Sequence, residues 1–192
     1  MNPNAYLLKD ILKPEMKATR DGYGEGLVLA GEKNKNVVVL CADLTESTRS
    51  LAFQKKFPER FVELGVAEQN MASVAAGMAL EGKVPFVSSY ATFSPGRNNE
   101  QIRTTIAYNE ANVKIAGAHA GISVGPDGAT HQALEDIGLM RMLPGMTVIV
   151  PCDYEEAKKA TVAAAEMAGP VYLRFGREKS PMMTTSHTPF KI

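Results

Sequence analysis

The chain has 192 residues and balances 21 Lys and Arg against 21 Asp and Glu, so its formal net charge at pH 7 is zero. A neutral chain has no electrostatic attraction for nucleic acid or for an anionic membrane surface, and we expect neither as a partner. Hydrophobic residues make up 45% of the chain and charged residues 22%, which predicts one globular domain with a well-buried core.

Targeting signals and cysteine pairing are also excluded by the sequence. No stretch reaches the roughly 20 apolar residues of a membrane-spanning helix, and the N-terminus lacks the profile of a signal peptide, so we expect a cytoplasmic protein. Cys41 and Cys152 stand singly within apolar runs. We therefore expect two buried thiols and no disulfide or metal pair.

Segments of helical composition alternate with short, β-prone apolar runs. In chain order we expect a helix at 18–33, strands at 37–41 and 61–64, a helix at 68–81, a strand at 84–88, a helix at 97–110, a strand at 113–116, a helix at 131–141, a strand at 147–150, a helix at 154–167 and a strand at 171–175. Strands that are apolar at nearly every position are covered on both faces. The pattern predicts an α/β fold, a doubly wound, mainly parallel sheet flanked by helices.

The two ends of the chain are set apart from this alternation. The last residues are polar and contain two prolines, so 179–192 is predicted to be an exit linker. We expect an N-terminal extension at 1–15 and the domain itself at 16–178.

Ligands of such sheets bind beyond the carboxyl ends of the strands, where loops lead into helices. The polar and aromatic residues of interest lie there: Asp43 to Ser47, Glu68, Tyr90, Phe93, His119 to His131 and Arg177. Phosphate-binding signatures are missing, because the sequence has no Gly-x-Gly-x-x-Gly after a strand, no Gly-Lys-Ser/Thr and no Gly-Asp-Gly with a downstream Asn. A phosphorylated cofactor would need another chain to hold its phosphates.

Glu68 opens the helix expected at 68–81. An acid at a helix N-terminus gains about 0.3–1 kcal/mol from the helix dipole, which explains Glu68 without any function. The helix is nearly all small or apolar, so we expect it to be buried on most of its circumference, and Glu68 with it. A buried carboxylate must be paired or protonated, so a functional role stays open.

Two aromatic rings and a Gly-rich loop follow neighbouring strands. Core packing explains Tyr90 or Phe93 alone, but two rings beside a buried carboxylate suggest a slot for a flat heterocycle. The loop carries His119 and His131, whose 12-residue separation fits no standard metal spacing. A polar, proton-transferring wall is the more economical interpretation. Anion binding is open to Arg20, Ser47 and Arg177, although a single Arg is most often a solvated surface charge.

The segments Glu63–Met71, Pro85–Arg103 and His119–Gln132 resemble the pyrimidine-binding domain of transketolase, and the resemblance covers essentially all of 16–192. The run Asp-Gly-Ala-Thr-His-Gln in the third segment is close to diagnostic. The resemblance implies transfer of a two-carbon ketol unit between sugar phosphates with thiamine diphosphate as cofactor. It further implies a diphosphate-binding partner subunit that carries Mg²⁺ or Ca²⁺, self-association as a dimer, and a separate C-terminal domain or subunit.

The resemblance assigns the cofactor site. Glu68 would hydrogen-bond the ring nitrogen N1′ of thiamine diphosphate and stabilise the imino tautomer that deprotonates the thiazolium C2. Phe93 would stack on the aminopyrimidine, Tyr90 would line the same slot and Asp43 would shape the cofactor cleft. Gly96 stands where many full-length transketolases have a tyrosine, a feature of the split, two-subunit transketolases.

The resemblance also assigns the substrate site. Asp127 and His131 would contact the hydroxyls of the sugar, and His131 would also transfer protons. The residues that would hold the sugar phosphate are Arg20, Ser47, His119 and Arg177.

Two alternatives remain. One is another thiamine-dependent subunit, of the deoxyxylulose-phosphate synthase type or a 2-oxo-acid dehydrogenase β subunit, the second disfavoured by the paired histidines and two arginines. The other is a non-catalytic domain that dimerises or regulates a partner.

Overall fold

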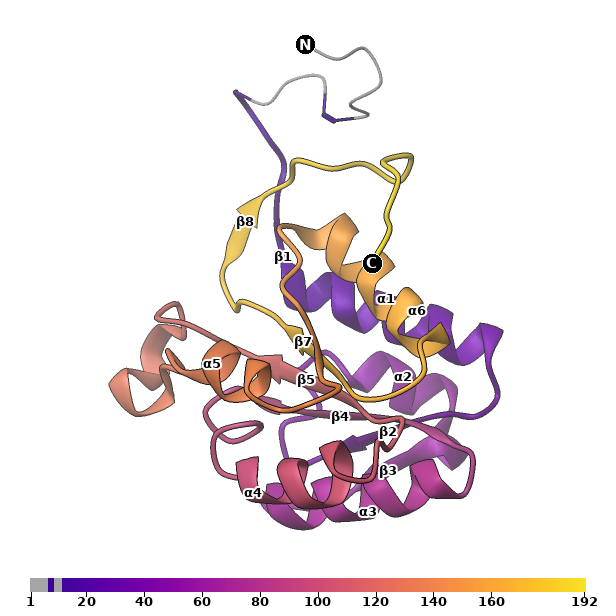
Figure 1. Ribbon diagram of the computed structural model, residues 1–192. Coiled ribbons are helices and arrows are strands. Elements are labelled where there is room, and N and C mark those ends of the chain that lie inside the picture. Colours follow the sequence, from indigo (N-terminus) through magenta and orange to yellow (C-terminus); the bar gives the residue numbers. More distant parts are fainter. Residues whose placement is uncertain (1–6, 9–11) are drawn as a thin grey trace.

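The core of the molecule is a parallel sheet, seen in a computed structural model that describes residues 7–8 and 12–192 (Figure 1). Within these residues the sheet has six strands in the order β3 (Phe61–Glu63), β2 (Val37–Cys41), β4 (Val84–Tyr90), β5 (Lys114–Ala118), β7 (Val171–Arg174) and β6 (Thr147–Ile149). Every residue of β2, β4 and β5 is buried, because helices cover both faces of the sheet. The predicted fold, a doubly wound parallel α/β sheet, is confirmed.

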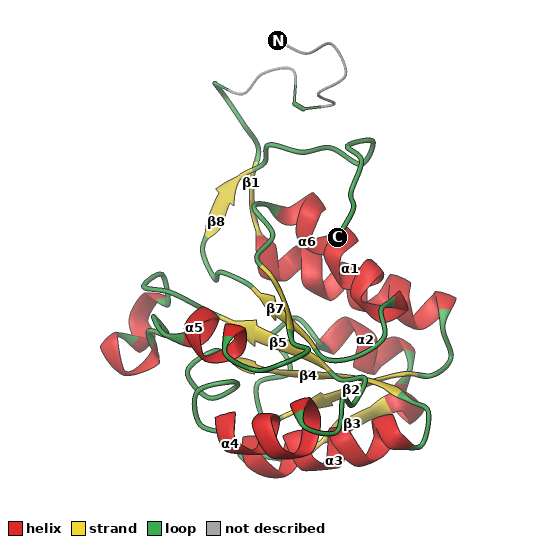
Figure 2. Ribbon diagram, in the orientation of Figure 1, coloured by secondary structure: helices red, strands yellow, loops and turns green. Residues whose placement is uncertain are grey.

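Helices form a layer on each side of the sheet (Figure 2). One face is covered by α1 (Thr19–Lys33), α2 (Leu51–Lys56) and α6 (Tyr154–Glu166), and the other by α3 (Glu68–Leu80), α4 (Asn99–Gln101), the π-helical η2 (Ile102–Ala107) and α5 (Asp136–Arg141). Short 3₁₀ turns lie at η1 (Pro58–Arg60), η3 (Gly125–Asp127) and η4 (Ala129–His131). Successive side chains of β2 point to opposite faces of the sheet, so the strand packs against both helix layers. Val39 packs toward the layer of α1, α2 and α6, and Leu40 packs toward the layer of α3 and α5.

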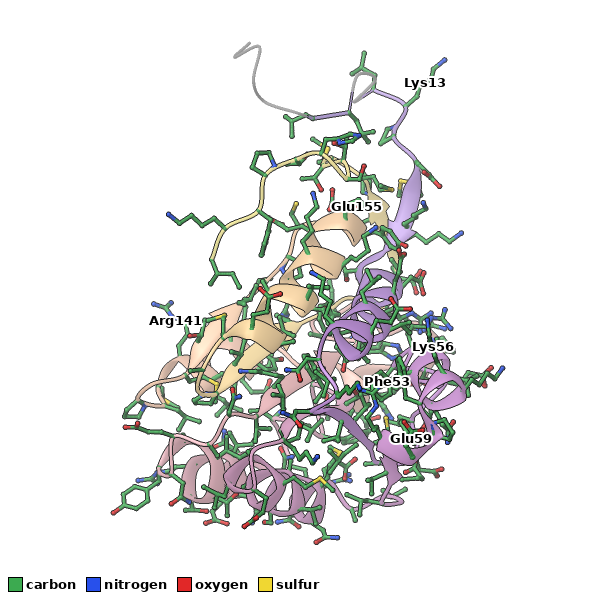
Figure 3. The ribbon with its side chains drawn as sticks, turned by 90° about the vertical axis from the view of Figure 1, so that its right-hand side faces the viewer. Lys13, Phe53, Lys56, Glu59, Arg141 and Glu155 are labelled. Carbon is green, nitrogen blue, oxygen red and sulfur yellow. The ribbon has the colours of Figure 1, made fainter. Side chains whose placement is uncertain are left out.

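Helices α1 and α6 lie against each other because glycines remove the side chains between them. A Cβ on Gly22 would stand 2.1 Å from the carbonyl oxygen of Tyr154, and one on Gly26 would stand 2.7 Å from the Cβ of Thr161. The short helix α2 packs beside α1 through Phe53, which is buried, whereas Lys56 of the same helix lies on the surface (Figure 3). The N-terminal turn of α1, which carries Arg20, is thereby held at a fixed place beside the sheet.

The helix expected at 97–110 divides into α4 and η2, and the helix expected at 131–141 begins only at Asp136. The expected strands and the other helices are found with ends shifted by one or two residues at most. No helix among the described residues is long and apolar enough to cross a membrane.

The expectation that α3 is buried on most of its circumference is wrong for this chain by itself. Glu68 is buried with Met71 and Ala75, on the face toward the sheet. The opposite face is exposed, and Leu80 there is 67% exposed. Because small residues occur on both faces of α3, the sequence did not distinguish the buried face from the exposed one.

Two further expectations are wrong. Cys41 is buried in β2, but Cys152 is exposed, because it stands in the loop that leaves β6 for α6. The segment 179–192 is packed and is no free linker, since β8 (Lys179–Pro181) pairs antiparallel with β1 (Met16–Ala18). Phe190 packs against the core. Residues 1–6 and 9–11 of the expected N-terminal extension lie outside the described residues.

Asp153 joins α6 to this C-terminal segment. Its Oδ1 accepts the N–H of Glu156 at 2.9 Å and caps α6, while its Oδ2 accepts the N–H groups of Met183 and Thr184 at 2.8 and 2.6 Å. Burial raises the pKa of this carboxyl, but the hydrogen bonds outweigh burial and its net pKa lies below the usual value. Ionised Asp153 therefore stabilises the fold above the pKa of an unfolded Asp, and this stability is lost as the pH falls through the lower pKa of the folded state.

We expect Asp153→Ala to lower the free energy of unfolding by about 2 kcal/mol at neutral pH, because the helix cap and the contacts to the C-terminal segment are lost together. Urea denaturation measures this loss. Asp153→Ser keeps a cap for α6 and should cost less, and Thr184→Val, which removes only a contact to the segment, should cost least. Equal stability of Asp153→Ala and the unmodified chain would contradict the role of Asp153.

Candidate active site

The predicted site residues lie at the carboxyl ends of neighbouring strands. Tyr90 is the last residue of β4 and His119 directly follows β5, and their ring centroids are 4.0 Å apart. Phe93, in the turn after β4, stacks near Tyr90 with the centroids 6.0 Å apart and the planes inclined by 14°. His131 approaches Phe93 edge-on at 5.3 Å. Four rings from two strand ends and the following loop therefore form one aromatic wall.

Glu68 lies beside this wall at the N-terminus of α3, and its side chain is only 1% exposed. Its Oε2 accepts a hydrogen bond from Nη1 of Arg97 at 2.8 Å, and its Oε1 accepts one from the Ser89 hydroxyl at 3.3 Å. The predicted burial of Glu68 is confirmed, and the required partner is an arginine. An isolated carboxylate at this depth would carry a large desolvation cost, which Arg97 and Ser89 offset.

Arg97 was not predicted from the sequence to belong to the site. The guanidinium carbon of Arg97 lies 4.5 Å from the ring centroid of Phe93, so one side chain contacts both the carboxylate and the aromatic wall. The available signal was its position, four residues after Phe93 inside a segment already of interest. In a turn, a spacing of four residues does not show whether two side chains point the same way, because the backbone conformation sets the direction of each side chain.

The turn between Phe93 and α4 is held by buried polar groups. Nδ2 of Asn98 donates to the backbone carbonyl of Glu68 at 3.0 Å and to the Ser94 hydroxyl at 3.2 Å. A Cβ on Gly96 would stand 2.0 Å from the carbonyl oxygen of Thr92, so this turn admits no side chain at that position. The glycine in place of a tyrosine is therefore required by the shape of the turn.

His119 and Arg20 form a second polar centre behind Tyr90. Nη1 of Arg20 lies 2.9 Å from Nε2 of the buried His119 and 3.2 Å from the backbone carbonyl oxygen of Ser47. A guanidinium only donates, so Nε2 accepts and the proton of neutral His119 lies on Nδ1. Burial, the largest cause, and the charge of Arg20 lower the pKa of His119 to about 4.

Two N–H groups of this centre point to a missing acceptor. Nδ1 of His119 and Nε of Arg20 are buried and have no hydrogen-bond partner within residues 7–8 and 12–192. A buried donor without an acceptor costs about 1–3 kcal/mol. An oxygen-rich anion would remove this cost, which fits the phosphate-binding role expected of Arg20 and His119.

A positively charged cavity of about 310 Å³ adjoins this centre. It is lined by Ala18, Arg20, Asp21, Arg49, Arg177, Glu178 and Lys179. Arg177 lies so close to Gly125 that a Cβ there would stand 1.8 Å from its Nη1. Burial and the charge of Arg49 lower the pKa of Arg20, and the charge of Arg177 lowers the pKa of both Arg20 and His119 further. Arg49, which pairs with Asp21 at 2.6 Å, was not expected from the sequence.

The remaining predicted residues lie at the edges of the site. His131 belongs to η4, where its Nδ1 is 2.9 Å from the Thr130 hydroxyl, and Asp127 is exposed in η3. Asp43 is exposed and adopts a positive φ of 58°. Its N–H donates to Glu63 Oε1 at 2.7 Å, an organising contact that sequence reasoning missed.

No group of three or more His, Cys, Asp or Glu side chains among the described residues is arranged to hold a metal ion.

Comparison with known proteins identifies relatives along most of the chain. The family model for the transketolase pyrimidine binding domain matches residues 15–182. A putative transketolase C-terminal section from Methanocaldococcus jannaschii is 51% identical over 167 residues, 87% of this chain and 53% of that protein. An apulose-4-phosphate transketolase subunit from Phocaeicola vulgatus is 37% identical over 166 residues, 86% of this chain and 53% of that protein.

A solved split-gene transketolase, an inactive β4 tetramer, superimposes with a TM-score of 0.81 and 47% identity over 91% of this chain and 55% of that one. The chain thus spans about half the length of the curated relatives from Methanocaldococcus jannaschii and Phocaeicola vulgatus.

We expect NMR to show that His119 stays neutral as the pH falls from about 7 to about 5, because its pKa is about 4. Arg20→Gln should raise this pKa by removing a nearby positive charge, yet leave it below the ordinary value, since burial remains the larger cause. Arg141→Gln, at an exposed position on α5 (Figure 3), is the matched control and should leave it unchanged. Titration of His119 at an ordinary pKa would contradict its burial beside Arg20.

The same shift affects folding. Because the folded pKa of His119 is below the unfolded one, its contribution to stability falls as the pH drops from about 6.5 toward the folded value.

Proposed function

The chain belongs to the transketolase family, and on that premise we propose that it is the transketolase subunit or fragment that activates thiamine diphosphate and binds the sugar phosphate. The observation that carries the proposal is the buried Glu68, which Arg97 joins to the ring of Phe93, at the same sheet edge as the unsatisfied donors of Arg20 and His119. The relatives described as a transketolase C-terminal section and a transketolase subunit support a divided enzyme.

The Glu68 region fits the pyrimidine half of the cofactor. It offers a buried carboxylate as acceptor and a partly buried aromatic face for stacking, held by an anchored turn. Bound thiamine diphosphate would supply the carbon nucleophile and electron sink of ketol transfer. Glu68 would hold a proton at the ring nitrogen N1′, Phe93 would orient the ring, Tyr90 would line the slot, and Asp43 would shape the cleft.

We place the diphosphate group and its Mg²⁺ or Ca²⁺ on a diphosphate-binding partner subunit. The sequence lacks the Gly-Asp-Gly motif with a downstream Asn that would bind them. The inactive β4 state of the split-gene relative supports a requirement for another subunit.

Sugar phosphate would bind against Arg20, Ser47, His119 and Arg177. Arg177 and Arg20 line one cavity, and the two unsatisfied donors of Arg20 and His119 would each gain an acceptor from phosphate oxygens. His131 would transfer protons near the reacting carbons, because its ring lies against Phe93. Asp127, on the same loop, would contact the sugar hydroxyls.

Self-association is part of the proposal. The outer face of α3 carries the small residues Ser73 and Gly77, and Val66 just before the helix is 70% exposed and Leu80 at its end 67% exposed. A Cβ on Gly77 would meet nothing within 4 Å, so another helix could approach closely there. Such a face is typical of a surface that another subunit covers. A separate C-terminal domain or subunit would complete the assembly.

Reconstitution tests the proposal. The chain alone should show no ketol transfer between a ketose phosphate and an aldose phosphate, and activity should appear when a diphosphate-binding transketolase subunit, thiamine diphosphate and Mg²⁺ are added. Glu68→Gln should reduce turnover by orders of magnitude, because an amide cannot hold the proton as a carboxylate does. Full activity of Glu68→Gln, or no activity in any reconstituted mixture, would refute the proposal.

Substitutions at the phosphate end should act differently from those near the reacting carbons. Arg177→Ala should raise KM for phosphorylated sugars about tenfold to a hundredfold with kcat far less changed, since it removes a charged contact made before and during reaction. His131→Ala should mainly lower kcat. Arg141→Ala provides the control for loss of one exposed charge. If Arg177→Ala raised KM equally for phosphorylated and unphosphorylated acceptors, Arg177 would not bind the phosphate.

A further inference from the structure

The side chain of Arg97 makes the two contacts that the proposed function assigns to the pyrimidine ring. Its Nη1 donates to Oε2 of Glu68 at 2.8 Å, and its guanidinium carbon lies 4.5 Å from the ring centroid of Phe93. A guanidinium is flat and carries several N–H donors, so it resembles an aminopyrimidine in both properties. Both groups cannot occupy the same place between Glu68 and Phe93.

We propose that Arg97 is a displaceable stand-in for the aminopyrimidine and thereby a positioning residue of the cofactor site. Before the cofactor binds, Arg97 neutralises the carboxylate of Glu68 and covers Phe93. When the ring enters, the guanidinium of Arg97 moves aside toward solvent. This inference rests on the proposed function, because it takes thiamine diphosphate as the incoming ligand.

Displacement requires that Arg97 can reach solvent while Glu68 stays buried, and the exposure of the two side chains differs in this way. The Glu68 side chain is 1% exposed and stays fixed at the start of α3, whereas the Arg97 side chain is 45% exposed. The carboxylate cannot reach water and needs a permanent partner, but the guanidinium has a path to solvent. Exchange of one partner for another therefore costs far less than leaving Glu68 unpaired.

The backbone of the turn need not move during this exchange. Asn98, directly after Arg97, is buried and bound to the Glu68 carbonyl and to Ser94, and Gly96 is pressed against Thr92. These contacts hold the turn on both sides of Arg97. A rotation of the arginine side chain alone would open the slot and leave Phe93 in place.

Arg97 then acts as a competitor that belongs to the chain itself. The apparent dissociation constant for the cofactor equals the intrinsic constant divided by the fraction of molecules whose slot is open. Removal of Arg97 raises that fraction, so it should tighten binding by speeding association, with the dissociation rate unchanged. A residue that held the bound cofactor would have the opposite effect.

The test compares Arg97→Met and Arg97→Lys with the unmodified chain, each in complex with the diphosphate-binding subunit. Stopped-flow and calorimetry with thiamine diphosphate and Mg²⁺ give the rate and equilibrium constants. We expect the Arg97→Met complex to bind thiamine diphosphate about fivefold more tightly, through a faster association rate. The factor is small because a half-exposed ion pair contributes only modestly to stability. Arg97→Lys keeps a cation for Glu68 but lacks the flat stacking group, so an intermediate value is expected. Arg103→Met, at an exposed position of η2, is the control.

Thermal unfolding of the chain alone gives a second measurement without the cofactor. Arg97→Met should unfold at a lower temperature than both the unmodified chain and Arg103→Met, because Glu68 loses its cation. Weaker cofactor binding by Arg97→Met, or binding equal to that of the unmodified complex, would overturn the inference. If the unmodified complex bound no thiamine diphosphate at all, the proposed function itself would fail, so the two failures are distinguishable.

Discussion

A carboxylate removed from water must have a partner, and this requirement governs the arrangement around Glu68. The side chain is held at the first turn of α3, where the helix packs against the sheet, and it accepts hydrogen bonds from Arg97 and Ser89. Ser89 belongs to β4 and Arg97 to the turn that follows it. The need to satisfy one buried charge therefore joins α3 to β4, and through Arg97 it connects the carboxylate to the ring of Phe93 in that turn.

The parallel sheet supplies the second constraint. Because both faces of β2, β4 and β5 are covered by helices, polar residues that follow these strands can only gather at the edge where the strands end. Tyr90, His119 and Arg20 meet there although they come from three separate parts of the chain. The same edge thus combines an aromatic wall with a positively charged cavity.

The sequence predicted the fold well because apolar runs and turn residues are local signals. The burial of Glu68 was also predicted, but from a wrong premise: α3 is buried on one face only, and Glu68 lies on that face. Contacts between distant segments were not: Arg97 pairs with a residue 29 positions away, and Glu63 binds the N–H of Asp43 across 20 positions. Polarity and prolines suggested a free segment at 179–192, yet its backbone pairs with β1, which no composition reveals.

The pairing of β1 with β8 also bears on how the protein can be shortened. Met16–Ala18 and Lys179–Pro181 are the partners of one another in a two-stranded sheet. A polypeptide cut after residue 178 would leave the backbone groups of β1 unpaired at the surface, and an open strand edge invites pairing with a second molecule. Expression boundaries for this protein should therefore retain the strand at the far end of the chain, together with the Asp153 contacts that hold it.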